Sequence, residues 1–225
     1  GPRLDGPSLN ALTRAEGVTM TAGVPTIWLN LLDAIDASGD RPKALRQVVI
    51  GGSAAPPVMI TRFQNLGIEA RHAWGMTETS PVGLSGALLP KHDALSDDAR
   101  LAMRAKQGRP LFGMEVRVMR EGQNAFGAMQ VRGPWVTAGY YNTDPGPSHT
   151  PDGWFDTGDV VTMDDDGYIQ IVDRTKDVIK SGGEWISSIA LENMAQAHEA
   201  VQEVAAVAVP DAKWGEVGKA FVVSK

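Results

Sequence analysis

Apolar and polar positions follow two periods along the first third of the chain. Apolar runs at residues 45–50 and 68–74 each end in a loop of small and polar residues, at 51–56 and 75–81. Residues 57–65, which lie between them, begin with proline and predict a helix. This order of strand, loop and helix predicts an open parallel sheet of the α/β class, in which ligands bind at the carboxyl ends of the strands.

Two helices and a strand are predicted before this sheet pattern. Residues 8–16 have leucines on one face and a glycine at their end, which predicts a short helix. Residues 18–21 are mostly β-branched or apolar and predict a buried strand. Residues 27–35 predict an apolar helix. Its Trp28 is interpreted as a core residue, with a pocket wall as the second interpretation.

The period of the pattern changes to two after Leu111. Residues 114–119, 129–132 and 135–141 predict short strands separated by glycine and proline, which indicates a β-rich subdomain. Its core is expected to include the tyrosine pair at 140–141. The preceding helical pattern at residues 93–104 carries no predicted chemistry, and His92 beside it is expected on a solvated face.

Three consecutive acids mark the turn of a predicted hairpin. Residues 160–163 and 168–172 read as its two strands, and residues 164–166 are all aspartate. Their spacing does not fit a calcium-binding loop, and no later glutamate completes one. We therefore assign these acids to the turn.

A cluster of charge and glycine follows this hairpin at residues 173–186. Arg174, Lys176 and Lys180 alternate with small or apolar residues, and a Gly-Gly pair precedes Glu184. Paired glycines let a backbone approach a ligand closely or reverse its direction. The residues alone leave two interpretations open, a ligand-binding loop and a charged hairpin at a domain edge.

The last residues predict a small α+β module that begins near Lys176. Residues 189–198 have helical spacing after a serine pair, and residues 201–209 and 219–224 predict strands. The chain stops inside the last predicted strand, so we expect it to be an incomplete part of a longer polypeptide.

Composition excludes several classes of function. The 225 residues are 43% hydrophobic and 21% charged, which is typical of globular domains. The formal charge of −6 argues against a general nucleic-acid surface, and no apolar run is long enough for stable membrane insertion. The absence of cysteine excludes disulfide and thiolate chemistry and fits a cytoplasmic enzyme.

Four separated blocks of the sequence resemble one family. They are GGSAAP at residues 51–56, WGMTET at 74–79, WFDTGD at 154–159 and GYIQIVDRTKDVIKSGGEWI at 167–186. In order and spacing they are similar to the adenylate-forming acyl-CoA synthetases, and the resemblance covers nearly the whole chain. The residues of these blocks are most similar to those of the medium-chain fatty-acyl branch, which includes ligases that activate 3-methylmercaptopropionate.

This resemblance implies a two-step reaction that uses ATP, Mg²⁺ and coenzyme A. A short- or medium-chain carboxylate would attack the α-phosphate of ATP, giving an acyl-adenylate and pyrophosphate. The thiol of coenzyme A would then displace AMP. The implied fold combines α/β and α+β parts, with the parallel sheet and the β-rich subdomain in residues 1–173 of a large N-terminal domain. A small mobile α+β C-terminal domain would follow at residues 174–225.

The resemblance also implies the residues of a nucleotide and acyl site. Trp74 would stack on adenine, Thr77 would bond a phosphate oxygen, and Glu78 would hold Mg²⁺. Asp159 would accept both ribose hydroxyls, and Arg174 would reinforce the ribose and phosphate contacts. The full set expected to contact ATP or AMP is Gly51, Gly52, Ser53, Trp74, Gly75, Met76, Thr77, Asp159 and Arg174. The acyl group is expected beside Gly51, Trp74, Gly75 and Met76.

Residues of the glycine-rich stretch would serve the second step. Lys176 aligns with the family's hinge, and we count it with Thr77 and Glu78 as catalytic. The implied coenzyme A contacts are Lys180, Gly182, Gly183, Glu184, Trp185 and Glu216. A structural turn is the second interpretation of Glu216.

The chain departs from the family at both of its ends. The family's phosphate-binding loop would precede Gly1, and the lysine that stabilises charge on the α-phosphate would follow Lys225, so residues 1–225 alone are expected to be a poor catalyst. Two alternatives stay open: an adenylate-forming enzyme that does not use coenzyme A, and a nucleotide-binding fragment without turnover. The expected partners are small molecules, and a homodimer is also considered.

Overall fold

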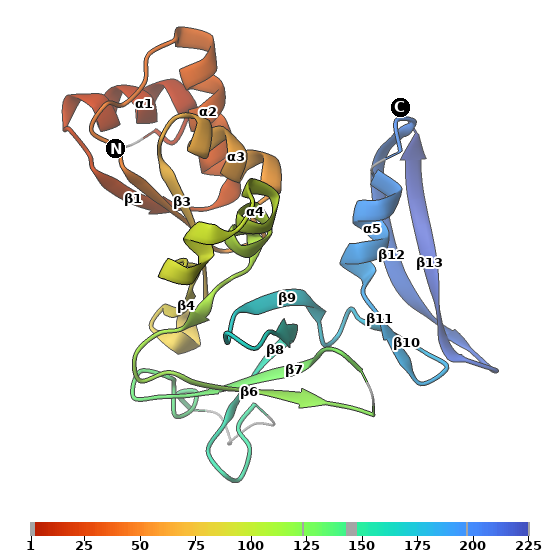
Figure 1. Cartoon of the computed structure of the whole chain (residues 1–225). Helices are drawn as coiled ribbons and strands as arrows, with labels where there is room; N and C mark the ends of the chain where they lie inside the picture. The colour runs from red at the N-terminus through yellow and green to blue at the C-terminus, as the bar shows by residue number, and fades with distance from the viewer. Residues whose placement is uncertain (1–2, 123, 143–147, 197, 225) are drawn as a thin grey trace. The chain divides into compact units, whose positions relative to one another are not determined.

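The computed structural model of the chain describes residues 3–122, 124–142, 148–196 and 198–224. The chain divides into two compact units. The first consists of Gly1–Met114, Trp135–Thr137 and Asp165–Ile169. The second consists of Glu115–Pro134, Ala138–Asp164 and Gln170–Lys225. Neither unit is therefore one continuous segment of the sequence. Figure 1 labels most of the helices and strands of both.

A five-stranded sheet with the order β1-β2-β3-β4-β5 forms the centre of the first unit. Its parallel strands are β1 (Met20–Gly23), β2 (Gln47–Ile50) and β3 (Glu69–Gly75). Two antiparallel strands complete it, β4 (Val82–Ser85) and β5 (Arg109–Pro110). The parallel part confirms the predicted α/β sheet, with β2 and β3 ending in the predicted loops.

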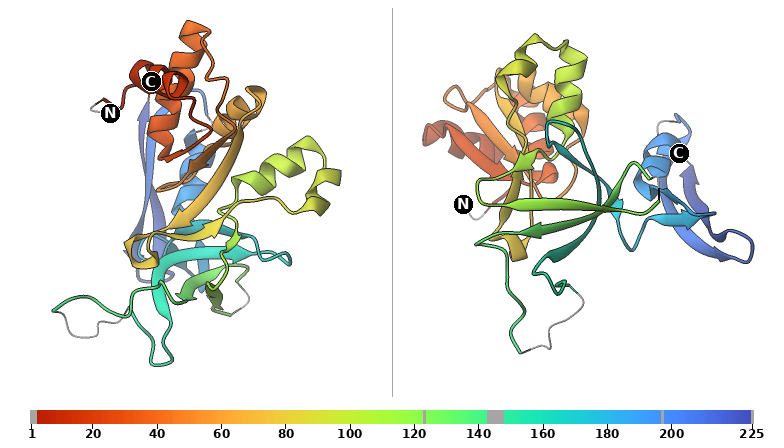
Figure 2. Two further views of the ribbon diagram at one scale, coloured as in Figure 1. Left: turned by 90° about the vertical axis from the view of Figure 1, so that its left-hand side faces the viewer. Right: turned by 60° about the horizontal axis from the view of Figure 1, so that its bottom comes forward.

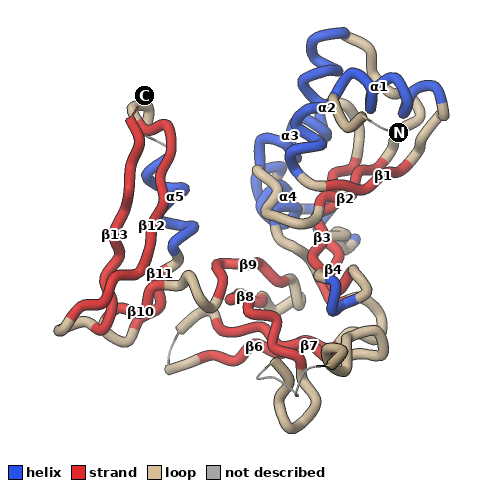
Figure 3. The backbone as a smooth tube through the Cα atoms, turned by 180° about the vertical axis from the view of Figure 1, so that it is seen from behind, coloured by secondary structure: helices blue, strands red, loops and turns tan. Residues whose placement is uncertain are grey.

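Helices of the first unit lie beside this sheet (Figure 3). They are α1 (Gly6–Ala15), α2 (Pro25–Ser38), α3 (Pro57–Asn65) and α4 (Asp97–Ala105), with short 3-10 helices at Thr77–Thr79 and Pro90–Ala94. None of the described helices combines the length and hydrophobicity needed to cross a bilayer.

The apolar core of this unit lies between the sheet and helices α2 and α3. Its fully buried side chains include Leu32, Ile50 and Phe63. Trp28 is 3% exposed, and its Nε1–H donates to the carbonyl oxygens of Gly23 and Val49, each at 3.1 Å. The interpretation of Trp28 as a core residue is confirmed, because both its ring and its polar atom are satisfied inside the fold.

The prediction that the first strand is buried is wrong. Met20 in β1 is 59% exposed, because β1 lies at the edge of the sheet and has only β2 as a neighbour. Apolar and β-branched composition indicated a strand but did not distinguish an edge position from a central one.

The prediction of a solvated His92 is also wrong. His92 is 4% exposed, with Nε2 at 3.3 Å from Oδ2 of Asp166 and its ring 5.3 Å from the ring of Tyr168. Asp166 also pairs with Lys91, and the hydrogen bonds from Lys91 and His92 lower the pKa of this carboxyl group. The predicted turn that contains Asp166 is confirmed, but its charge has a partner distant in sequence.

An antiparallel sheet with the order β6-β7-β8-β9 belongs to the second unit. Its strands are β6 (Glu115–Arg120), β7 (Gly127–Arg132), β8 (Phe155–Met163) and β9 (Ile169–Arg174). These strands confirm the β-rich region, and β8 and β9 confirm the predicted hairpin. Residues 135–141 do not form the expected strand, and Tyr140 and Tyr141 are 49% and 98% exposed rather than in a core.

The predicted small α+β module is also present in the second unit. Its sheet has the order β11-β10-β13-β12, from strands β10 (Ile179–Ser181), β11 (Glu184–Ile186), β12 (Val201–Asp211) and β13 (Gly215–Ser224). Helix α5 (Ser188–Gln196) lies along β12 (Figures 1 and 2), where Glu192 accepts a hydrogen bond from Ala206 N at 2.9 Å. The domain boundary expected at residues 173–174 stays a prediction.

Candidate active site

The loop at residues 51–56 leaves the carboxyl end of β2. Gly51 N donates to Gly23 O at 3.1 Å. Gly52 has a φ of +83°, and a Cβ added there would lie 2.9 Å from Cγ1 of Val24. A Cβ added at Gly51 would meet only Ala73 O, at 3.7 Å. Gly52 is therefore required by the backbone itself, whereas the space around Gly51 is open in the chain as it stands.

His72, for which the sequence pattern gave no prediction, lies between this loop and the end of helix α4. Its ring is 2% exposed, with Nδ1 at 2.9 Å from Ala105 O and Nε2 at 3.4 Å from Ser53 O. Burial lowers the pKa of His72, so the ring is neutral near pH 7. The shorter contact assigns its N–H to Nδ1, which donates to Ala105. The sequence pattern carried no signal for this role, because it depends on the strand register, in which His72 lies opposite Ile50, next to the loop.

A second loop follows β3 and is built around Thr79, which the motif analysis did not single out. Thr79 is fully buried, and its Oγ1 accepts a hydrogen bond from Met76 N at 2.9 Å. The same hydroxyl lies 2.8 Å from Pro81 O, to which it donates. A Cβ added at Gly75 would lie 1.7 Å from Pro81 O, so the loop can close only with glycine there.

The predicted ligands Thr77 and Glu78 lie on this closed turn. Thr77 is exposed and Glu78 is half-buried, and Glu78 O accepts from Thr137 N at 2.8 Å. Across the part of the chain that the structure describes, no three or more His, Asp or Glu side chains cluster as a metal site. A Mg²⁺ ion held by Glu78 would therefore take its remaining ligands from phosphate oxygens and water, which suits this ion.

Trp74 is packed into the first unit rather than exposed at its surface. It is 8% exposed, and a Cβ added at Gly83 of β4 would lie 2.6 Å from the indole ring. Gly83 thus provides the space that the ring fills. Stacking of Trp74 on adenine stays a prediction, and it would need a part of the ring face that this packing leaves accessible.

Asp159 lies in an irregular part of β8. Ala128 pairs with Val160 and Gln130 with Asp156, so Met129 alone faces Thr157, Gly158 and Asp159. A bulge of this kind bends a strand and redirects its side chains, and bulges are frequent beside active sites.

The bulge is held by hydrogen bonds on all sides. Thr157 Oγ1 donates to Met129 O at 2.9 Å and accepts from Asp159 N at 3.1 Å. Gly158, with a φ of +71°, donates its N–H to Oδ1 of Asp156 at 3.0 Å and accepts from Thr175 N at 2.9 Å. These hydrogen bonds fix the backbone of the bulge and therefore the position of Asp159. The side chain of Thr157 makes two of them.

Arg174 lies beside Asp159 within the second unit. Its Nη1 is 3.0 Å from Oδ1 of Asp159 and 3.3 Å from Thr157 O. The side chain of Asp159 is 4% exposed, whereas that of Arg174 is 52% exposed. A buried carboxylate is stabilised by such a cation, and a half-exposed guanidinium offers further N–H groups to an anion. The structure thus brings these two predicted residues together.

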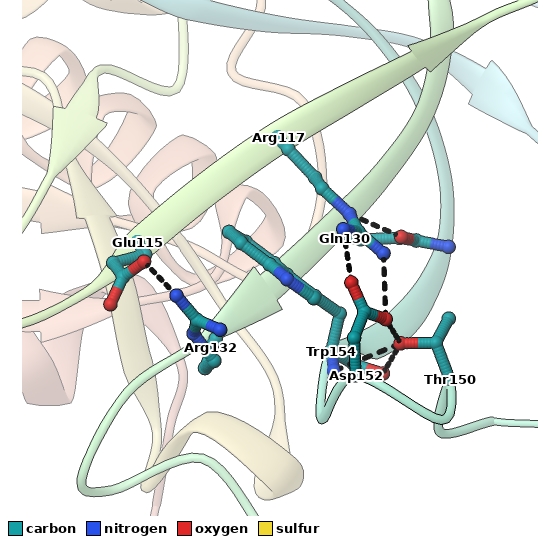
Figure 4. A network of polar contacts seen from close by, with 7 residues as sticks. All are labelled: Glu115, Arg117, Gln130, Arg132, Thr150, Asp152 and Trp154. Carbon is teal, nitrogen blue, oxygen red and sulfur yellow. Dashed lines mark hydrogen bonds and ion pairs between the residues drawn. The ribbon is translucent and has the colours of Figure 1, made fainter.

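A stacked cation–aromatic network fixes the start of β8 (Figure 4). The Trp154 ring lies between the guanidinium groups of Arg117 and Arg132, at 4.5 and 4.6 Å from the ring centre. Asp152 pairs with Arg117 at 2.7 Å, and Glu115 pairs with Arg132 at 2.5 Å. Hydrogen bonds from Arg117 and Thr150 lower the pKa of Asp152 to about 2. The network anchors Trp154, which directly precedes β8 and lies three residues before the bulged segment at residues 157–159.

The predicted coenzyme A residues gather at the β10–β11 hairpin. Gly182 and Gly183 form its turn with φ values of +61° and +88°, and Ser181 pairs with Glu184. Because both φ values are positive, this turn favours glycine at each position. The interpretation as a charged hairpin is thus correct for the local fold, and it does not exclude a ligand.

Contacts around the hairpin bring Lys180, Trp185 and Glu216 together. Lys180 Nζ lies 4.9 Å above the Trp185 ring, and Lys180 N donates to Oε2 of Glu216 at 2.7 Å. Trp185 also contacts Phe126, with 6.2 Å between ring centres. The bond to Lys180 N supports the structural interpretation of Glu216, while its role toward coenzyme A stays a prediction.

The predicted nucleotide residues are divided between the two units. Gly51, Gly52, Ser53, Trp74, Gly75, Met76, Thr77 and Glu78 belong to the first unit, and Asp159 and Arg174 belong to the second. Within the second unit, Lys176 is exposed in a turn at residues 175–177 between β9 and β10.

Comparison with known proteins decides the family. The AMP-binding enzyme family matches residues 1–141, and the C-terminal domain of AMP-binding enzymes matches residues 190–225. The chain belongs to the AMP-binding enzyme family. The resemblance predicted from the four sequence blocks is thereby confirmed.

Curated relatives of this AMP-binding enzyme are acyl-CoA ligases. The long-chain-fatty-acid–CoA ligase of Thermus thermophilus is 47% identical over 100% of this chain and 43% of its own length. The medium-chain-fatty-acid–CoA ligase of Ectopseudomonas oleovorans is 46% identical over 96% and 41%. The 3-methylmercaptopropionyl-CoA ligase of Ruegeria pomeroyi is 45% identical over 96% and 41%. The chain thus spans less than half the length of the curated relatives it matches.

Solved structures of o-succinylbenzoate coenzyme A synthetase from Bacillus subtilis share the fold. The complex with its acyl-adenylate intermediate matches with a TM-score of 0.79 and 29% identity, over 97% of this chain and 44% of the synthetase. The complex with ATP and magnesium matches with a TM-score of 0.77 and 28% identity, over 96% and 44%. The predicted combination of α/β and α+β parts is confirmed.

Proposed function

We propose that this AMP-binding enzyme is part of an acyl-CoA ligase that activates a short- or medium-chain carboxylate with ATP. The observation that carries the proposal is the Asp159–Arg174 pair, in which a bulged strand holds a buried carboxylate 3.0 Å from a half-exposed guanidinium. Such a pair offers acceptors for the two ribose hydroxyls and donors for a phosphate. The names of the curated relatives support a thioester product.

In the first half-reaction, a carboxylate oxygen attacks the α-phosphorus of ATP and the bond to pyrophosphate breaks. Asp159 would hold the ribose, and Arg174 would hold the ribose and the phosphate. Thr77, exposed on the turn after β3, would donate its hydroxyl to a phosphate oxygen, and Glu78 would hold Mg²⁺. Mg²⁺ would offset the negative charge of the phosphates. The acyl chain would lie beside Gly51, where the backbone has open space.

In the second half-reaction, the coenzyme A thiol attacks the acyl carbon and AMP leaves. The glycine turn of the β10–β11 hairpin would let the pantetheine chain pass close to the backbone, with Lys180 and Trp185 beside it. Lys176 would be the pivot between the arrangements for the two steps, because a few residues at the end of an element can absorb such a motion.

An adenylate-forming enzyme that does not use coenzyme A is the alternative, and one experiment separates the two. The full-length natural protein is incubated with ATP, Mg²⁺ and a panel of acids from propionate to dodecanoate that includes 3-methylmercaptopropionate. The proposal expects AMP release that depends on both the acid and coenzyme A, with an acyl-CoA product. AMP release that is independent of coenzyme A would favour the alternative. No AMP release with any of the acids would contradict the proposed substrate class.

A cytoplasmic location and a homodimer also belong to this proposal. The lack of cysteine in the 225 residues fits a reducing compartment. The oligomeric state is tested by sedimentation of the full-length protein.

A further inference from the structure

Asp173 and Ser188 join the two sides of the segment that contains Lys176. Asp173 is 1% exposed at the end of β9. Its Oδ2 accepts from Ser188 N at 2.6 Å and from Ser188 Oγ at 2.9 Å, and its Oδ1 accepts from Arg174 N at 2.8 Å. A carboxylate in this position binds three donors, two of which belong to the first residue of helix α5.

A second bond runs beside the first. Ser187 Oγ donates to Val172 O at 2.8 Å and accepts from Ala190 N at 3.0 Å, so it both caps helix α5 and contacts β9. Together, the two serines close the base of a loop that contains the turn at residues 175–177 and the β10–β11 hairpin. We call these contacts of Asp173 with Ser188 and of Val172 with Ser187 the serine clasp.

The serine clasp constrains any rotation at Lys176. Asp173 precedes Lys176 in the chain, and Ser188 follows it on the far side of the hairpin. A large rotation of the backbone dihedrals at Lys176 would separate the two, and the buried carboxylate would lose two of its three donors. Bonds to a buried charge are costly to break, so the closed clasp favours one arrangement of helix α5 relative to β9.

We propose that Asp173 and Ser188 are positioning residues that hold helix α5 and the β10–β11 hairpin in one of two arrangements. This inference rests on the proposed two-step function, in which Lys176 is the pivot. The clasp must open and close in each turnover. Its strength therefore sets the balance between adenylate formation and thioester formation, although neither residue touches a reacting atom.

The matched variants are Ser188→Ala and Glu192→Ala. Ser188→Ala removes one side-chain bond of the clasp and leaves Asp173 and Arg174 in place. Glu192→Ala also removes one side-chain bond of helix α5, to Ala206 N, but that bond lies within the α+β module and does not cross Lys176. A general loss of stability in α5 would affect both variants in the same way.

The two half-reactions are measured separately in the full-length protein, as acid-dependent exchange of pyrophosphate into ATP and as thioester formation from a preformed acyl-adenylate. We expect Ser188→Ala to change the ratio of the two rates by about tenfold, the loss typical of one bond to a charged group. Glu192→Ala is expected to leave the ratio unchanged. An unchanged ratio in Ser188→Ala, or the same change in both variants, would overturn the inference.

Trypsin cleavage after Lys176 gives a second readout that needs no catalysis. Lys176 is exposed in its turn, and opening of the clasp frees the backbone around it. We expect Ser188→Ala and Asp173→Asn to be cut there about tenfold faster than wild type, and Glu192→Ala to be cut at the wild-type rate. Equal cleavage in all four proteins would contradict the clasp. Because this assay is independent of coenzyme A, it decides the clasp even if the proposed ligase activity fails.

Discussion

Nη1 of Arg174 lies 3.0 Å from Oδ1 of Asp159, although fourteen residues separate them in the sequence. The pair brings together two of the blocks that identified the family, WFDTGD and the stretch that begins at Gly167. A bulge in β8 and the last residue of β9 bring it about. The geometry supports the prediction that both blocks contribute to one nucleotide-binding site.

Replacing Arg174 with glutamine should weaken nucleotide binding and the fold together. The substitution leaves the Asp159 carboxylate buried without its cation, and we expect a loss of about 2 to 4 kcal/mol in the free energy of unfolding. Arg174→Lys keeps the charge but loses the forked geometry, so it should recover stability more than ATP affinity. Chemical denaturation and calorimetry measure the two quantities. Full ATP affinity in Arg174→Lys would argue against a role for its planar fork.

Two glycine substitutions should separate a ligand contact from a folding requirement. A Cβ at Gly51 meets only Ala73 O at 3.7 Å, so Gly51→Ala should change stability by less than about 1 kcal/mol. If the nucleotide or acyl group approaches Gly51, the same variant should lose affinity for it. Gly75→Ala places its Cβ against Pro81 O and should cost more than about 3 kcal/mol. Wild-type ligand affinity in Gly51→Ala would remove Gly51 from the site.

The network around Trp154 should give the fold an acid-dependent contribution. The pKa of Asp152 is lowered from 3.8 to about 2, chiefly by Arg117, so its stabilising effect is present above pH 3.8 and is lost as pH falls through about 2. Asp152→Asn removes this effect. Wild type should therefore lose more stability than Asp152→Asn when unfolding is followed over that interval. Parallel loss in both proteins would show that the pair with Arg117 does not contribute.

Lys176→Pro should slow thioester formation more than adenylation. Proline fixes φ at this turn and removes the backbone N–H, which restricts the rotation expected between the two steps. The two half-reaction assays measure this, with Lys176→Ala as the control that removes the side chain but leaves the backbone free. An equal loss of both half-reactions in Lys176→Pro would count against a pivot at this residue.

The elements of the fold were largely predictable because their signals are local. The strands that end in GGSAAP and WGMTET, the proline-started helix and the glycine pair all depend on short patterns of size and backbone freedom. The burial of His92 and the exposure of Tyr140 and Tyr141 were not predictable in this way. The burial of His92 depends on contacts with residues far away in the sequence, such as Asp166. The exposure of the two tyrosines likewise depends on the tertiary fold, about which local periodicity gives no information.

The candidate site was identified by its blocks, whereas the residues that hold it were missed. Thr79 and Thr157 each use a side-chain hydroxyl to bond backbone atoms of a loop or bulge that carries predicted site residues, and His72 is buried against the loop at Ser53. A threonine inside a motif could be read as a ligand or as an anchor from sequence alone. Only the hydrogen-bond partners distinguish the two, and those partners follow from the tertiary fold.

The most direct test of the central claim is the binding of ATP with Mg²⁺ to Asp159→Asn and Asp156→Asn, measured by calorimetry in the full-length protein. Both variants lose one negative charge from β8, and asparagine at position 156 still has an oxygen to accept from Gly158 N. We predict that Asp159→Asn weakens ATP binding by about ten- to a hundredfold, because it removes the carboxylate that we propose to accept two ribose hydroxyls. Asp156→Asn should bind like wild type. Equal affinity in all three proteins would contradict a nucleotide site at Asp159.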